Sequence, residues 1–73
     1  MKRVVVFVFL GIGECGQISE CTVSRSRSDN EIAFGRFDYG VHYTEAWQEA
    51  AISLSVRLDK LKTVTLLRME WED

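Results

Sequence analysis

The sequence predicts a small α+β domain in which one helix packs on one face of a four-stranded, mostly antiparallel sheet. Three observations lead to this fold class. Residues 4–10 are an unbroken run of Val, Phe and Leu, residues 44–61 repeat apolar side chains at helical spacing, and residues 63–71 alternate as a strand does. Seventy-three residues suffice for one domain, so we expect residues 1–73 to form a single β-β-β-α-β unit.

The first two strands are expected to form a hairpin. The run at residues 4–10 is apolar on both faces, which is typical of a strand in the interior of a sheet. Three glycines between residues 11 and 16 mark a turn after it. Residues 17–25, in which apolar and hydroxyl side chains are mixed, are then predicted to return as the second strand.

A polar loop at residues 26–30 leads to a predicted third strand at residues 31–39. The helix is predicted to begin near Thr44, which is a suitable N-cap residue, and residues 63–71 form the last strand. The apolar stripe expected to face the sheet recurs at steps of four and three along the helix: Trp47, Ala51, Leu54, Leu58 and Leu61.

These elements predict how the sheet is ordered and which face is covered. Three meandering strands followed by a helical crossover would place the last strand parallel to the first, in the spatial order 4-1-2-3. One helix covers only one face of such a sheet. The other face would be solvated, or covered by aromatic residues of the third strand, by a second copy in a homodimer, or by a larger partner protein.

Composition excludes several classes of function. Eleven acidic and nine basic residues give a net charge of −2, so the chain lacks the strongly basic character of a nucleic-acid-binding domain, and we expect no direct nucleic-acid partner. No apolar segment approaches the roughly 18–20 residues that span a membrane, so no membrane association is expected. The short Val/Phe run after Lys2 and Arg3 suits a strand better than a signal peptide, and a cytoplasmic location follows.

The sequence shows no pattern typical of a catalytic site, and we expect no enzymatic activity, no cofactor and no bound metal. Cys15 and Cys21 are too far apart for a CxxC redox motif, although they could pair across the predicted turn outside a reducing cytosol. His42 could supply a third metal ligand and Glu14 or Glu20 a fourth, but the spacing matches no common zinc site. A small redox or metal protein built on the two cysteines and His42 is therefore an alternative from another class.

Aromatic and Arg residues crowd into the segment before the helix, and these types are enriched at protein interfaces. On the predicted third strand, Phe34 and Arg36 would point to one face and Tyr39 to the other, so one helix could not cover them all. That strand would also be a sheet edge open to β-augmentation. The basic loop before it adds further candidates. The predicted partner contacts are Phe34, Arg36, Tyr39, Arg25 and Arg27.

The favoured function is a non-catalytic protein-binding module. With its short, acidic, proline-free sequence and a Val/Phe-rich opening after Met1-Lys2-Arg3, the chain resembles the small bacteriophage inhibitors of bacterial RNA polymerase, of the Xanthomonas-phage type. The resemblance implies inhibition of transcription initiation by binding the polymerase and displacing or weakening its σ factor. The runner-up is a phage inhibitor of a bacterial immune nuclease, which is less favoured because only Glu70, Glu72 and Asp73 cluster as acids that could imitate nucleic acid.

Overall fold

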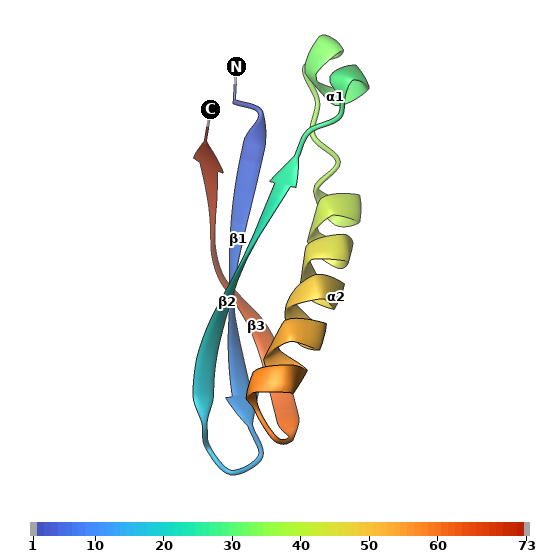
Figure 1. Ribbon diagram of the computed structural model, residues 1–73. Helices are drawn as coiled ribbons and strands as arrows, with labels where there is room; N and C mark the ends of the chain where they lie inside the picture. The colour runs from blue at the N-terminus through green and yellow to red at the C-terminus, as the bar shows by residue number, and fades with distance from the viewer. Residues whose placement is uncertain (1, 73) are drawn as a thin grey trace.

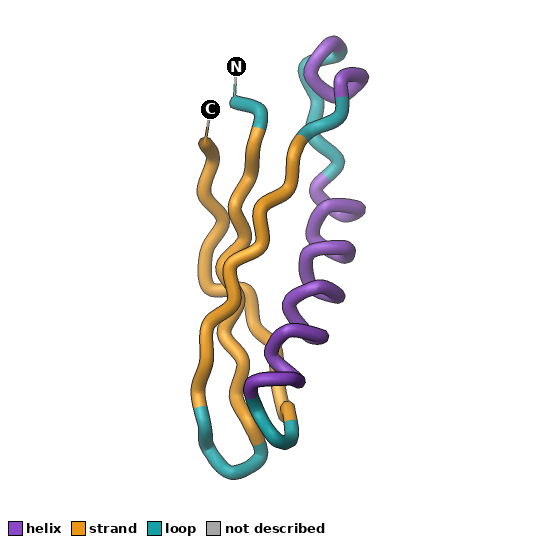
Figure 2. Tube along the Cα trace, viewed as in Figure 1, coloured by secondary structure: helices purple, strands orange, loops and turns teal. Residues whose placement is uncertain are grey.

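A computed structural model describes residues 2–72 of the chain (Figure 1). Its elements follow in the order β1 (Val4–Gly13), β2 (Ile18–Ser26), α1 (Asp29–Ala33), α2 (Tyr39–Arg57) and β3 (Leu61–Glu72). The strands form one sheet in the order β2-β1-β3, and both pairs are antiparallel. Helix α2 lies alongside one face of this sheet, in an elongated molecule of 46 × 17 × 14 Å (Figure 2). No helix within residues 2–72 has the length and apolar character needed to cross a bilayer.

The α+β class, the hairpin of the first two strands and the central position of the first strand are confirmed. The four strands and the order 4-1-2-3 were wrong, because residues 31–39 are not a strand: they complete helix α1, form the loop to α2 and provide the first residue of α2. With one strand fewer before the helix, the direction of the last strand reverses. Strand β3 is therefore antiparallel to β1 rather than parallel, and the sheet edges are β2 and β3.

One face of β1 builds the core under α2. Val5, Phe7 and Phe9 are completely buried, and they are joined by two buried residues of β2, Cys21 and Val23. Large side chains on the central strand thus form the middle of the core under the helix. Each fully buried side chain of this size contributes about 1.5–3 kcal/mol to the free energy of unfolding.

The stripe that the helix presents to the sheet agrees with the predicted one only in part. Leu54 and Leu58 are buried as predicted, but Leu61 already belongs to β3. Toward the start of the helix the buried residues are Ala50 and Ala46, whereas Trp47 remains 38 % exposed. Small alanines let the helix backbone approach the bulky Phe7 and Phe9 of β1, which two large facing residues would prevent. The Trp47 stripe has the same period, but it is turned toward the flank of the helix.

The other face of β1 is closed by its neighbours in the sheet. Val6 and Val8 are only 7 % and 4 % exposed, although α2 lies on the opposite side. The strand register places polar side chains on both sides of them, including Arg68 beside Val8 and Glu70 beside Val6. Arg68 and Glu70 are paired at 2.7 Å. Long polar side chains cover neighbouring apolar surface with their aliphatic stems, so the middle of this face is shielded within the chain itself.

Candidate protein-binding site

Helix α1, the residues around it and the first residues of α2 form a compact cap, defined here as residues 27–41, at one end of the molecule (Figure 1). Its first turn is fixed by a capping box between Ser28 and Glu31. The Glu31 N–H donates to Ser28 Oγ at 3.1 Å, and the Ser28 N–H donates to Glu31 Oε1 at 2.9 Å. A capping box satisfies two backbone donors at once, so Ser28 starts a helix where the sequence analysis predicted the approach to a strand.

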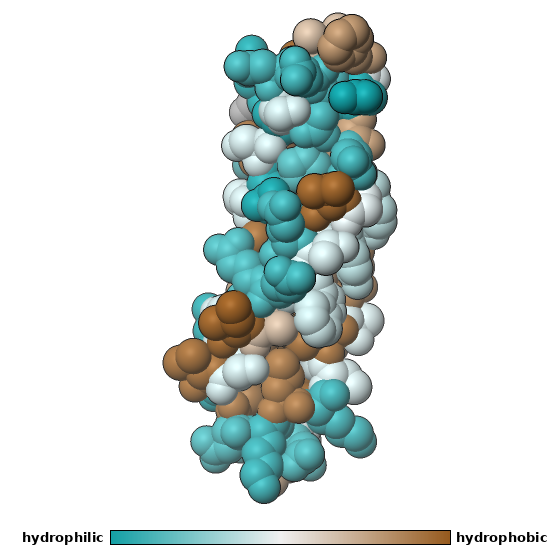
Figure 3. Space-filling model, turned by 90° about the vertical axis from the view of Figure 1, so that its right-hand side faces the viewer, coloured by the Kyte–Doolittle hydropathy of each residue, from teal (hydrophilic) through white to brown (hydrophobic). Residues whose placement is uncertain are grey.

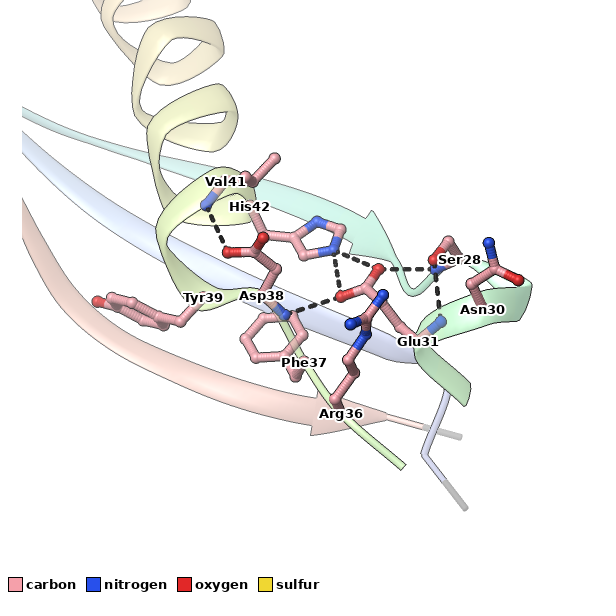
Figure 4. A pocket seen from close by; sticks show the side chains of 9 residues that line it. All are labelled: Ser28, Asn30, Glu31, Arg36, Phe37, Asp38, Tyr39, Val41 and His42. Atoms are coloured by element: carbon pink, nitrogen blue, oxygen red, sulfur yellow. Dashed lines mark hydrogen bonds and ion pairs between the residues drawn. The ribbon is translucent and has the colours of Figure 1, made fainter. Parts of the chain in front are cut away.

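Glu31 then holds the rest of the cap against helix α2 (Figure 4). Its Oε2 accepts the Asp38 N–H at 2.9 Å, and His42 Nε2 lies 3.0 and 3.1 Å from the two carboxylate oxygens. Hydrogen bonds from the backbone of Asp38 and Ser28 and from His42 lower the pKa of Glu31 to about 2, against an opposing effect of burial. One carboxylate thus connects α1, the loop and α2.

His42 occupies a fixed position between this carboxylate and strand β2. Arg25 Nε donates to His42 Nδ1 at 3.4 Å, which leaves Nε2 as the nitrogen that donates to Glu31. The ring of Phe37 stacks on the imidazole at 5.0 Å with an angle of 6° between the planes. Both ring nitrogens of His42 and both oxygens of Glu31 therefore have partners. The pair thereby positions the cap against α2.

The two predicted Arg contacts of the polar loop are engaged within the molecule. Arg25 forms an ion pair with Glu45 on α2, in addition to its bond to His42. Arg27 donates to the carbonyl oxygens of Lys2, Glu31 and Arg36, and its guanidinium lies 5.8 Å from the centre of the Trp71 ring. Arg25 thus ties β2 to α2, and Arg27 ties the cap to Lys2 and to Trp71 of β3. They would have to leave these partners to bind another protein.

Phe34 and Arg36 are placed differently, because both side chains project from the cap into solvent. Phe34 is 74 % exposed, and the Arg36 guanidinium lies 5.7 Å from the centre of its ring. Their backbones are nevertheless fixed: the Phe34 N–H donates to Asn30 O at 3.0 Å and the Arg36 N–H to Glu31 O at 2.8 Å. Gly35, at φ 64°, allows the chain to turn between them.

Tyr39 lies on another part of the cap. It is 45 % exposed and stacks on Tyr43 with 5.6 Å between ring centres. Tyr39 and Arg36 line the same pocket of about 570 Å³, whereas Phe34 lies outside it (Figure 4). The full lining comprises Ser28, Asn30, Glu31, Arg36, Phe37, Asp38, Tyr39, Val41 and His42.

Glu31 and His42 organise this site, and neither is among the predicted partner contacts. A signal for Glu31 is present as the S-x-x-E pattern of residues 28–31, which indicates a capping box. The predicted strand at residues 31–39 and the predicted helix start near Thr44 leave His42 between the two elements. It lies inside α2 instead, because Asp38 caps the helix by accepting the Val41 N–H at 3.3 Å. No local pattern shows that a histidine and a glutamate eleven positions apart will meet.

The residues proposed for a redox or metal site are not brought together as a ligand cluster. Both cysteines are free: Cys15 is exposed in the hairpin turn, and Cys21 is buried opposite Phe9. Within residues 2–72, no three His, Cys, Asp or Glu side chains are grouped so that they could hold a metal ion. His42 contacts Arg25, Glu31 and Phe37 instead.

The Glu31 network predicts a specific dependence of stability on pH. The pKa of Glu31 is about 2 in the folded chain and 4.5 as its ordinary value. The ionised carboxylate therefore contributes stability that is fully present above about pH 4.5 and is lost as the pH falls toward 2. We expect wild type to be more stable than Glu31→Gln at neutral pH, and the difference to shrink over that window.

Urea denaturation of both chains from about pH 7 to about pH 2 measures this difference. Glu49→Gln, on the exposed side of α2, is the matched control and should follow wild type. A difference between wild type and Glu31→Gln that stays constant over the whole range would contradict the role of the ionised carboxylate.

Comparison of the chain with protein-family models, with curated proteins and with solved structures finds no match.

Proposed function

We propose that the chain is a non-catalytic protein-binding module that binds a larger host protein with its cap. One observation carries this proposal: Phe34 is 74 % exposed on a segment whose backbone is held by hydrogen bonds on both sides of it. At this exposure the ring gains little from packing within the chain itself. On a pre-ordered backbone it can enter a partner's pocket with little loss of conformational entropy.

Arg36 supports the same role and defines the surface that would fit. Its guanidinium stacks near Phe34, so the pair presents an apolar ring and a cation side by side. A complementary partner surface offers an apolar pocket for the ring and a carboxylate for the guanidinium, since Arg binds carboxylates through two parallel hydrogen bonds. Figure 3 shows an apolar patch at the cap end of the molecule, set among hydrophilic side chains.

A second apolar patch lies on the outer face of α2, where Ile52 and Val56 are 70 % and 85 % exposed (Figure 3). These are aliphatic residues on a regular helix surface. Interface hot spots are richer in aromatic and Arg residues than in Val or Leu. The cap is therefore the favoured contact surface, and the α2 patch provides a comparison for experiments.

For the partner, we propose bacterial RNA polymerase in the host cytoplasm, with the chain acting as a phage-type inhibitor that displaces or weakens the bound σ factor. The support is the resemblance of the sequence to small phage inhibitors of this enzyme, together with a single pre-ordered contact surface. An inhibitor of an immune nuclease is the alternative within the same class.

The test is a titration of purified bacterial RNA polymerase holoenzyme with the chain, in which σ retention and promoter-dependent transcription are measured together. We expect saturable binding, partial or complete release of σ and a matching loss of initiation. An absence of binding to core enzyme and holoenzyme at about 10 µM chain, well above typical inhibitor affinities, would overturn the polymerase assignment. It would leave the cap as a binding surface for another protein.

A further inference from the structure

The cap contributes little to the hydrophobic core. The buried cluster formed by α2, β1 and β2 contains no residue of the cap, and Phe37 packs against it while remaining partly exposed. Tyr39, at the start of α2, adds a contact with Phe7 at 6.2 Å between ring centres. The backbone of α1 lies apart from the strands and from α2 (Figure 1). Apolar packing therefore joins the cap to the rest of the chain only along its final residues.

Polar contacts hold the remainder of the cap in place. The Glu31 carboxylate oxygens lie 3.0 and 3.1 Å from His42 Nε2, and one of them accepts the Asp38 N–H. Arg27 donates to the backbone oxygens of Lys2 and Arg36. Two side chains thus provide most of the attachment, and the pair of Glu31 and His42 is called the latch below.

The closed cap also leaves one polar group unsatisfied. Arg27 Nε is buried and has no hydrogen-bond partner within residues 2–72. A buried donor without a partner lowers the stability of the form that buries it. Detachment of the cap would return this group to water, so only the closed form is destabilised by it.

We propose that the cap opens and closes as one unit, with the latch holding it closed, while the three strands and α2 from His42 onward stay folded. Segments with few buried apolar contacts open at a lower free energy than the core does. A detached helix of five residues is too short to persist, so the backbone hydrogen bonds of Phe34 and Arg36 are lost together with the latch. The core under α2 keeps all of its buried residues.

Closing gives the chain a surface that the open form lacks. The closed cap holds Phe34 and Arg36 beside each other on an ordered backbone. For the binding surface proposed above, the closed cap is the competent form, so the latch sets the fraction of chains that are ready to bind. This consequence rests on the proposed function, whereas the opening itself does not, and its measurement needs no partner.

Native-state hydrogen exchange of the whole chain, followed by NMR in low concentrations of urea, measures the opening. The reporters are the N–H groups of Phe34, Arg36 and Asp38 in the cap and those of Val5 and Phe7 in the central strand. Relative to an unstructured peptide, we expect the cap groups to exchange at least about tenfold faster than the strand groups. Their rates should respond weakly to urea, because opening exposes little surface, whereas the strand rates should rise steeply.

Two variants separate opening of the cap from global unfolding. Val23→Ala removes buried apolar surface from the core, so it should accelerate exchange in the strand at least about tenfold and leave the cap rates unchanged. Glu31→Gln should accelerate exchange in the cap at least about tenfold, and in the strand by the same factor, because it destabilises the closed form from which both openings start. Glu49→Gln, on the exposed side of α2, is the matched control and should change neither rate.

Cap groups that share the urea dependence of the strand groups, or that accelerate with them in Val23→Ala, would overturn the proposal, since the cap would then open only when the whole chain unfolds. The urea dependence is measured on wild type and decides the point even when Val23→Ala does not fold. Unchanged cap exchange in Glu31→Gln would also overturn it, because the latch would then lie elsewhere.

Discussion

Val6→Asp is expected to abolish folding at neutral pH. Val6 lies on the central strand and is only 7 % exposed, although no helix covers its face of the sheet. An aspartate there would be an unpaired buried charge, and the register places Glu70 beside it, so that repulsion adds to desolvation. The cost is several kcal/mol, which matches the roughly 3–5 kcal/mol of stability available to a core of this size.

Far-UV circular dichroism and thermal melting measure the outcome. Val56→Asp is the matched control, because Val56 is 85 % exposed on α2 and the same substitution there leaves the charge in water. We expect Val56→Asp to melt within a few degrees of wild type and Val6→Asp to show no cooperative transition. A folded Val6→Asp would contradict the conclusion that neighbouring side chains close this face of β1.

The sequence predicted those parts of the fold that depend on strong local patterns. The run at residues 4–10 is so rich in β-branched and aromatic residues that it favours a central strand over a helix or a loop. The prediction of a third strand was wrong. Aromatic residues at 34, 37 and 39 are typical of strands, but the short-range capping box of Ser28 and Glu31 decides the conformation of this segment. Once that segment is not a strand, the predicted strand order necessarily changes.

The orientation of α2 could not be predicted from helical period alone. Two stripes with nearly the same spacing run along this helix, one through Trp47 and Ala51 and one through Ala46 and Ala50. Which one faces the sheet depends on the side chains opposite. Phe7 and Phe9 fill the space above β1, so only the alanine stripe can approach.

The candidate site, like the orientation of α2, could be predicted only in part, because contacts between distant residues decide it. Residue type alone indicated Phe34 and Arg36, and the structure places them together and exposed. Arg25 looked equally available in the sequence, but its partners His42 and Glu45 come from a helix seventeen and twenty positions away. Long-range pairings of this kind leave no local trace in a sequence.

The double substitution Phe34→Ala/Arg36→Ala is expected to remove most partner binding while leaving the fold intact. One hot-spot residue of these kinds contributes about 2 kcal/mol or more, so the loss of even one such contribution lowers affinity at least about 30-fold. Stability should change by only about 0.5 kcal/mol, because both side chains are exposed. The contact that ties Arg27 to residue 36 uses the backbone oxygen and survives the substitution.

Quantitative affinity capture from a bacterial lysate tests most directly whether the cap is the binding surface. It compares three chains: wild type, this cap double variant, and Ile52→Ala/Val56→Ala on α2. Both double variants remove two exposed side chains, one pair from the cap and one from α2. We predict that wild type and the α2 variant retain the same host protein in similar amounts and that the cap variant retains almost none of it. Equal retention by the cap variant, or a loss confined to the α2 variant, would contradict the assignment of the cap as the binding surface.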